Sequence, residues 1–143
     1  HCPALPAIVQ TISAKIEAHG GAALIIDYGD WHSQGDTLQA VQNHSPANPF
    51  ANPGLADLTA HVDFEAIAKA ALSFTRVTQQ GVFLERLGFT ARAQALAKGL
   101  TGDALEAHIG AHRRLTHPDE MGSLFKVIGL YPPQGAPPPG LDP

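Results

Sequence analysis

The sequence is poor in the features that mark several classes of protein. Its single cysteine, Cys2, excludes an internal disulfide framework and fits a reducing compartment. Nine basic residues stand against 13 acidic ones, and the formal net charge of -4 argues against a nucleic-acid binder, which usually carries a basic face. No apolar run approaches the roughly 20 residues that span a bilayer, and no signal peptide is visible. The residues that are present, 44% hydrophobic and 15% charged, are typical of one globular domain.

Several motifs of known chemistry are also missing. The sequence contains no GxGxxG, GxxxxGK[ST] or GxSxG pattern, which excludes a dinucleotide fingerprint, a phosphate loop and a nucleophile elbow. His108 and His112 are spaced as two metal ligands on a helix, and His117 follows them. Because no HExxH pattern and no Cys or acidic ligand completes the set, we predict a helix surface here and no metal site. Bound metal in the purified protein would instead indicate a metal hydrolase.

Hydrophobic periodicity divides the chain into regular elements. It predicts helices over residues 4–18, 64–72, 80–87, 90–99 and 101–115, and strands over residues 22–26, 74–78 and 124–130. Asp63, Thr90 and Thr101 are expected to cap the helices that follow them. Residues 30–57 are expected to be irregular, with a helical turn or two over Asp36–His44. The Pro-rich segment 132–143 is expected to be extended or disordered.

The run Ala22–Ile26 decides the fold class. It is apolar at every position, which is typical of a central parallel strand covered on both faces in an α/β fold. Three strands make a small sheet for 143 residues, so we expect the C-terminal half of a larger doubly wound sheet. We predict one domain over residues 1–131, with an irregular insertion at about 30–57, followed by the tail 132–143.

Asp27, Tyr28 and Gly29 follow that strand directly. Ligands of open α/β sheets bind outside the carboxyl ends of the strands, so these residues are candidates for a substrate pocket. Asp27 can accept hydrogen bonds from a cationic substrate, or it can cap neighbouring backbone. Tyr28 offers a ring face and a hydroxyl, or it packs. Gly29 allows a sharp turn and the close approach of another group.

A second group of candidates lies between the long irregular segment and the next helix. Asp57, Thr59 and His61 are not explained by helix capping, unlike Asp63. They line the same cleft as Asp27 if the irregular segment folds back over the strand end. His61 is explained equally well as an exposed loop histidine.

Five blocks of sequence resemble, in order, the C-terminal half of the MidA-like methyltransferases. The blocks are GGAALIIDYGD, GDTLQAVQNH, NPGLADLTAHVDF, TQQGVFLERLGF and EMGSLFKVIGL. Members of this family use S-adenosylmethionine, and the mitochondrial ones act as protein arginine methyltransferases in respiratory complex I assembly. The resemblance implies a partial Rossmann-like sheet, in which residues 22–26, 74–78 and 124–130 are the fifth, sixth and antiparallel seventh strands.

The resemblance also implies what this chain lacks. In such enzymes the elements that hold S-adenosylmethionine come earlier in the sequence, so we expect no cofactor-binding residue here and no activity of this chain alone. The implied partner is a protein substrate, such as a complex I subunit, in a bacterial cytoplasm or a mitochondrial matrix. An exposed edge of a half-sheet favours a homo-oligomer. The alternative is a non-catalytic segment that binds a partner or assists assembly.

The catalytic residues are unknown at this stage, but a pocket for arginine can be outlined. A guanidinium is recognised by carboxylates in bidentate geometry, and Asp27 and Asp57 are the carboxylates that we expect in this role. Tyr28 can stack on the planar group, while Thr59 and His61 can shape the pocket.

Overall fold

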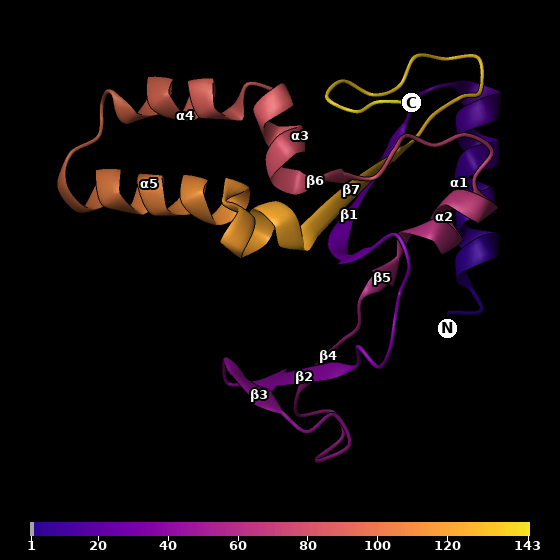
Figure 1. Cartoon of the computed structure of the whole chain (residues 1–143), viewed down its shortest axis with the longest axis horizontal. Helices are drawn as coiled ribbons and strands as arrows, with labels where there is room; N and C mark the ends of the chain where they lie inside the picture. The colour runs from indigo at the N-terminus through magenta and orange to yellow at the C-terminus, as the bar shows by residue number, and fades with distance from the viewer. Residues whose placement is uncertain (1) are drawn as a thin grey trace.

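The computed structural model describes residues 2–143, which form five α-helices and seven strands in two separate sheets (Figure 1). The helices are α1 (Leu5–His19), α2 (Phe64–Ala70), α3 (Gln80–Arg86), α4 (Phe89–Ala97) and α5 (Gly102–Thr116). The strands are β1 (Ala23–Asp30), β2 (Gln39–Gln42), β3 (Ser45–Ala47), β4 (Asp57–Thr59), β5 (Val62–Asp63), β6 (Thr78–Gln79) and β7 (Phe125–Leu130). A short π-helical turn, Pro118–Gly122, precedes β7. The predicted α/β class is confirmed.

The main sheet has the strand order β5-β1-β7-β6 and is mixed. β7 runs antiparallel to β1, with Ala23 opposite Leu130 and Tyr28 opposite Phe125. β5 is parallel to β1 and pairs with it only at the last two positions, where Gly29 lies opposite Val62. The antiparallel last strand is therefore confirmed, and it lies between β1 and β6.

The main core lies between α1, α2 and one face of this sheet. Val9 and Ile16 of α1 and Phe64 and Ile67 of α2 are buried against Ile128 of β7. The spacing of seven between Val9 and Ile16 places both on one helix face, which explains why α1 forms along this surface. Asp63 caps α2 as predicted, since its Oδ1 accepts a hydrogen bond from the Ala66 N–H at 3.0 Å.

β1 corrects the prediction for residues 22–26 in two ways. The strand continues to Asp30, and only alternate residues are covered. Ala23 and Ile25 pack against the main core, whereas Leu24 is 47% exposed and Ile26 is 44% exposed on the opposite face. An all-apolar run does not by itself show that both faces are covered, because alternate residues point to opposite sides of a strand. Within residues 2–143 the expected burial on both faces is therefore wrong.

The segment after β1 is not the helical turn that we expected over residues 36–44. β2 and β3 form a hairpin whose turn residues, Asn43 and His44, have φ values of 49° and 61°. Positive φ at both central positions is the requirement of a tight hairpin turn, and Asn tolerates it well. β4 pairs with the other edge of β2, and the resulting sheet β3-β2-β4 lies apart from the main sheet (Figure 1).

The strand predicted over residues 74–78 is much shorter. Only Thr78–Gln79 pairs continuously with β7, and Phe74 makes a single bridge to Leu130. Between them the buried Thr75 hydroxyl accepts a hydrogen bond from the Gly129 N–H at 2.9 Å. The Thr75 N–H also donates to the Gly129 carbonyl at 2.9 Å, so Thr75 bonds to β7 through both its main chain and its side chain.

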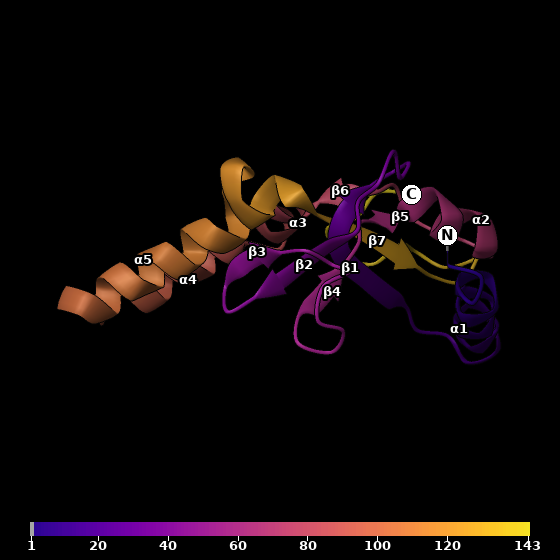
Figure 2. The ribbon, with the colours of Figure 1, turned by 90° about the horizontal axis from the view of Figure 1, so that it is seen from below.

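The helices α4 and α5 form an arm that projects away from the main sheet (Figure 2). Neither helix has a buried residue. The predicted cap at Thr90 is wrong, because Gly88 occupies the cap position with a φ of 78°. Thr90 instead donates its hydroxyl to Glu85, and its oxygen lies 2.8 Å from His112 Nε2. This side chain therefore links α3, α4 and α5.

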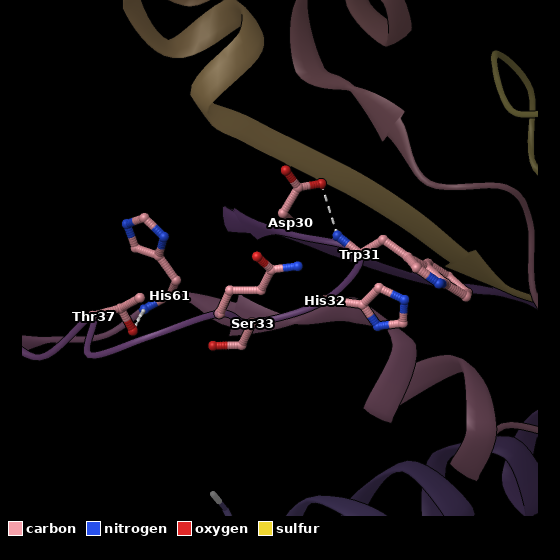
Figure 3. Close-up of a pocket in the computed structure, with 7 residues that line it drawn as sticks. Asp30, Trp31, His32, Ser33, Thr37 and His61 are labelled. Carbon is pink, nitrogen blue, oxygen red and sulfur yellow. Dashed lines mark hydrogen bonds between the residues drawn. The ribbon is translucent and has the colours of Figure 1, made fainter.

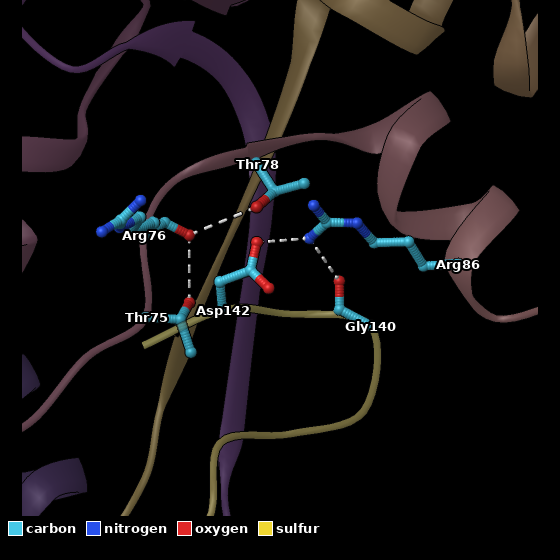
Figure 4. A network of polar contacts seen from close by, with 6 residues as sticks. All are labelled: Thr75, Arg76, Thr78, Arg86, Gly140 and Asp142. Carbon is cyan, nitrogen blue, oxygen red and sulfur yellow. Dashed lines mark hydrogen bonds and ion pairs between the residues drawn. The ribbon is translucent and has the colours of Figure 1, made fainter.

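The Pro-rich tail contains no helix or strand, yet it is packed onto the sheet. Leu141 is buried with Phe83 and Val127 on the face opposite α1. The Arg86 guanidinium binds Asp142 Oδ2 at 2.8 Å and also donates to the Gly140 carbonyl (Figure 4). The tail is therefore not simply extended: it makes two turns, in which the Gly135 N–H donates to the Pro132 carbonyl and the Leu141 N–H donates to the Pro138 carbonyl. The division into a domain over 1–131 and a tail stays a prediction, and its first residue, His1, lies outside the described residues.

None of the helices within residues 2–143 combines the length and the apolar character that crossing a membrane requires.

Candidate functional site

The end of β1 opens into a hollow of about 440 Å³ (Figure 3). The side chains around it come from the β1 end, the segment that follows it and the residue before β5. They are Asp30, Trp31, His32, Ser33, Gln34, Thr37 and His61. The group contains a carboxylate, an indole, two imidazoles, two hydroxyls and an amide, so it suits a polar ligand with a planar part.

Gly29 allows this hollow to form. Its φ is 155°, and a side chain there would overlap the main-chain carbonyl oxygen of Val62. Because Gly29 carries no side chain, β5 approaches β1 closely enough to pair with it. This pairing places His61, the residue before β5, beside Tyr28, and His61 and Asp30 both line the hollow.

Main-chain contacts fix the first residues after the strand. Asp30 Oδ1 accepts a hydrogen bond from the Trp31 N–H at 2.8 Å. The Trp31 carbonyl accepts another from the Glu65 N–H at 2.9 Å, which ties it to the first turn of α2. The Trp31 side chain itself remains partly exposed. Asp30 and Trp31 also line a second hollow of about 430 Å³, over β6 and Lys126.

Lys126 stabilises the same strand end from the neighbouring strand. Its Nζ donates to the Gly29 carbonyl at 3.0 Å and to the Ser123 carbonyl at 2.7 Å. Lys126 lies opposite Asp27 in the ladder, yet its hydrogen bonds go to these carbonyls. The ammonium group therefore holds the backbone of β1 in place.

His61 is anchored from both sides. Its N–H donates to Thr37 Oγ1 at 3.1 Å, which brings the two walls of the hollow together (Figure 3). Its ring meets the Tyr28 ring edge to face, with centroids 5.9 Å apart, and Tyr28 meets Phe125 in the same way at 5.5 Å. Such aromatic pairs fix ring orientation.

A charged cluster lies beside the hollow on α2. Glu65 Oε2 lies 2.9 Å from Lys69 Nζ and 3.0 Å from His32 Nδ1. The hydrogen bond from Lys69 lowers the pKa of Glu65 below its ordinary value, and the neighbouring His32 acts in the same direction. Glu65 therefore stays ionised and holds His32 at the rim of the hollow.

The predicted site residues are placed as follows. His61 lines the hollow, Tyr28 contacts it through the His61 ring, and Gly29 supports it. Asp27 Oδ1 accepts a hydrogen bond from the Tyr28 N–H at 2.8 Å, which is the capping alternative considered above. Asp57 and Thr59 lie in β4 of the small sheet, where they pair with β2. The structure thus groups His61 with the end of β1, and places Asp57 and Thr59 in a different sheet.

Sequence reasoning missed Asp30, Trp31, His32 and Thr37. The first three follow Gly29 directly, as the letters DWH. A strand that was expected to end at Ile26 drew attention to the residues just after Ile26, whereas the strand ends four residues later. Reading the carboxyl end of β1 at its true position would have found Asp30 and Trp31.

The histidines of the α4–α5 arm have other partners. His108 Nε2 lies 2.9 Å from the Ala93 carbonyl, which can only accept, so this nitrogen carries the proton. The His112 ring stacks on Phe89 with centroids 5.5 Å apart. Among residues 2–143, no group of three or more His, Cys, Asp and Glu side chains is arranged to hold a metal.

The described residues do not fit the cradle for S-adenosylmethionine that the family resemblance implies. Such a cradle needs a glycine turn after a strand, with free space for the ligand against the backbone. Gly29 lies at the end of a strand, as such a cradle requires. The space beside it is not free for a ligand, because Val62 occupies it. The glycine turn at the end of β1 is therefore not such a cradle.

Comparisons with known proteins agree on one family. A family profile described as "Putative S-adenosyl-L-methionine-dependent methyltransferase" matches residues 1–82, more than half of the chain. The chain belongs to this family. A Drosophila melanogaster relative, "Protein arginine methyltransferase NDUFAF7 homolog, mitochondrial", is 35% identical over 129 residues, which are 87% of this chain and 30% of the relative. The family resemblance read from the five sequence blocks is thereby confirmed.

Two solved structures extend the match to the fold. An uncharacterised Burkholderia thailandensis protein of the family superposes with a TM-score of 0.75 at 34% identity, covering all of this chain and 38% of its own. A second structure from that organism, bound to S-adenosyl-homocysteine, gives a TM-score of 0.72 at 32% identity, covering 96% of this chain and 36% of its own. The predicted methyltransferase-type α/β fold is confirmed, and the chain spans about a third of the length of the proteins that it matches.

Proposed function

We propose that this chain forms the substrate-binding part of an S-adenosylmethionine-dependent protein arginine methyltransferase. The observation that carries the proposal is the position of Asp30 and Trp31. They lie together at the carboxyl end of a sheet strand, in an open hollow next to His61. The family match supports methyl transfer, and the mitochondrial protein arginine methyltransferase homologue from Drosophila melanogaster supports arginine as the acceptor.

The hollow has the chemistry that a guanidinium needs. Within residues 2–143 the Asp30 carboxylate accepts one hydrogen bond, through Oδ1, so Oδ2 can receive a guanidinium N–H. The Trp31 indole offers a face for cation–π stacking, and an arginine side chain is planar enough to use it. We therefore expect Asp30, and not Asp27 or Asp57, to be the carboxylate that binds the guanidinium of the substrate.

His61 completes the arrangement. Alkylation of a guanidinium nitrogen releases a proton, and an imidazole at the wall of the hollow is able to accept it. The hydrogen bond from the His61 main chain to Thr37 and the contact with Tyr28 hold the ring in place. In this proposal Tyr28 is a positioning residue for His61. Thr59 is assigned no such role, because it pairs with Gln39 in the small sheet.

The remaining parts of the proposal concern the longer protein. S-adenosylmethionine supplies the methyl group and is held by residues outside this chain. The partner is a protein that presents arginine, with a respiratory complex I subunit as the expectation from the family resemblance. A mitochondrial matrix or a bacterial cytoplasm is the expected compartment, and the Drosophila melanogaster relative named above is a mitochondrial protein.

Methylation by the full-length enzyme tests this assignment. Asp30→Asn removes the charge but keeps the size, so we expect a large loss of kcat/KM for an arginine peptide. Asp27→Asn is the matched control, because Asp27 bonds to its neighbouring backbone. Equal activity of the Asp30→Asn variant and the native enzyme, with loss only in the Asp27→Asn variant, would return the role to Asp27.

A further inference from the structure

The small sheet β3-β2-β4 and the loop between β3 and β4 carry several exposed apolar side chains. Phe50 is 79% exposed, Leu55 is 65% exposed and Leu58 is 60% exposed, and Val41 on β2 is also exposed. These side chains lie within one short segment that stands apart from the main core (Figure 1). Contiguous exposed apolar groups on a folded protein usually mark a surface that binds something.

Of the two edge strands of this sheet, one is better able than the other to pair with a strand of another protein. In the sheet of the described residues both β3 and β4 are edge strands. The middle residue of β3 is Pro46, which has no N–H and blunts that edge. β4 consists of Asp57, Leu58 and Thr59, all of which have an N–H, so its outer edge can pair with an added strand.

The charge around this edge selects the partner. The segment 36–59, which contains the small sheet, has two acidic residues and neither lysine nor arginine. Asp57 is exposed on β4 itself, and Asp36 lies before β2. A cationic segment is attracted to such a surface and an anionic one is repelled.

β4 is also close to the candidate site along the chain. Only Ala60 separates Thr59 of β4 from His61 at the wall of the hollow. The bond from the His61 N–H to Thr37 Oγ1 ties this connection to the segment that enters β2. An extended chain advances roughly 3.3 Å per residue, so a segment paired with β4 can place a residue a few positions away in the hollow.

We propose that β4 is the docking strand for the protein substrate, which adds an extended segment of alternating basic and apolar residues to its outer edge. The proposal rests on the proposed function, since the docked segment presents an arginine to the hollow. The basic residues lie on the face of Asp57, and the apolar ones lie on the opposite face, where they cover Leu58. The surface thus selects substrates by sequence around the target arginine.

Binding and kinetics test the two ideas separately. The probe is a fluorescein-labelled peptide of alternating arginine and valine, measured by fluorescence anisotropy with this chain. We expect Asp57→Lys to weaken binding about tenfold, because it places like charges together. Glu106→Lys makes the equivalent charge change on the exposed face of α5 and should leave binding unchanged. The same peptide with N-methylated valines, which cannot complete a strand ladder, should bind at least as poorly.

Three binding results would each overturn the docking proposal. Equal effects of Asp57→Lys and Glu106→Lys would show a general charge effect, and full binding of the N-methylated peptide would exclude strand addition. A native dimer that Asp57→Lys dissociates, together with no peptide binding, would assign the edge to a second copy. In the full-length enzyme Asp57→Lys should raise KM for the peptide and leave the KM of a small arginine derivative unchanged. Peptide binding that depends on Asp57, without any methylation, would retain the docking strand and reject the proposed function.

Discussion

Gly29 and Val62 approach so closely that no side chain fits between them. An added Cβ on Gly29 would overlap the Val62 carbonyl oxygen, and the Gly29 φ of 155° is strained for other residues. This contact joins β5 to β1 and brings His61 to the hollow. The geometry of the candidate site therefore depends on one position that must be glycine.

Gly29→Ala should separate β5 from β1 and lower stability by about 2 kcal/mol, the sum of backbone strain and steric overlap. The matched control is Gly35→Ala, since Gly35 also has a positive φ, of 72°, but has open space around it. Urea unfolding of both variants measures the difference. Equal losses would show that strain alone matters and that the contact with Val62 does not.

The sequence was informative where local chemistry decides the structure. The α1 periodicity, the Asp63 cap and the last strand were predicted correctly, because each follows from neighbouring residues. The hairpin β2–β3 was missed, because its turn uses Asn43 and His44 without a glycine. A segment of four residues is too short for the alternation of apolar and polar residues to distinguish a strand from a helical turn.

The candidate site shows the same limit. Which residues meet at the end of β1 depends on the contact with β5, which comes from a position more than thirty residues further along the chain. Sequence reasoning found His61 and the neighbourhood of Gly29, but it placed Asp57 and Thr59 in the same cleft as Asp27. The structure pairs them with β2, because the segment that was expected to be irregular forms its own sheet.

The Pro-rich tail is held by an apolar contact and an ionic one, and two substitutions compare how much each contributes to stability. Leu141→Ala removes a buried side chain that packs with Phe83, so we expect a loss of about 2 kcal/mol. Asp142→Asn removes the exposed ion pair with Arg86, which should contribute under about 1 kcal/mol. Chemical denaturation measures both. A larger loss from Asp142→Asn than from Leu141→Ala would mean that the ionic contact anchors the tail.

The Glu65 cluster predicts a pH effect with a definite sign. The folded-state pKa of Glu65 is lowered by Lys69, so this contact stabilises the fold above the ordinary pKa and is lost as the pH falls through the lowered one. Lys69→Met should raise the pKa of Glu65 and make stability depend less on pH in the acidic range. Carboxyl-carbon NMR titration measures the shift. Lys15→Met on α1, far from Glu65, is the control and should leave the Glu65 titration unchanged.

The chain alone should not bind S-adenosylhomocysteine, although a structural relative was solved with it. The space beside Gly29 is filled by Val62, and the described residues provide no other glycine turn after a strand of the main sheet. Isothermal titration calorimetry of the chain with S-adenosylhomocysteine is the measurement. Micromolar affinity would place a cofactor-binding surface within residues 2–143 and contradict our assignment.

Trp31 is the single tryptophan of the sequence, so its fluorescence reports on the candidate hollow directly. An arginine-containing peptide should change this fluorescence when its guanidinium stacks on the indole and bonds to Asp30. The same peptide with citrulline, which is planar but neutral, should have little effect. Asp30→Asn should weaken the response to the arginine peptide, whereas Asp103→Asn, at an exposed position of α5, should not. If citrulline and arginine peptides change the fluorescence equally, the hollow does not recognise a cation, and Asp30 is not the residue that selects the substrate.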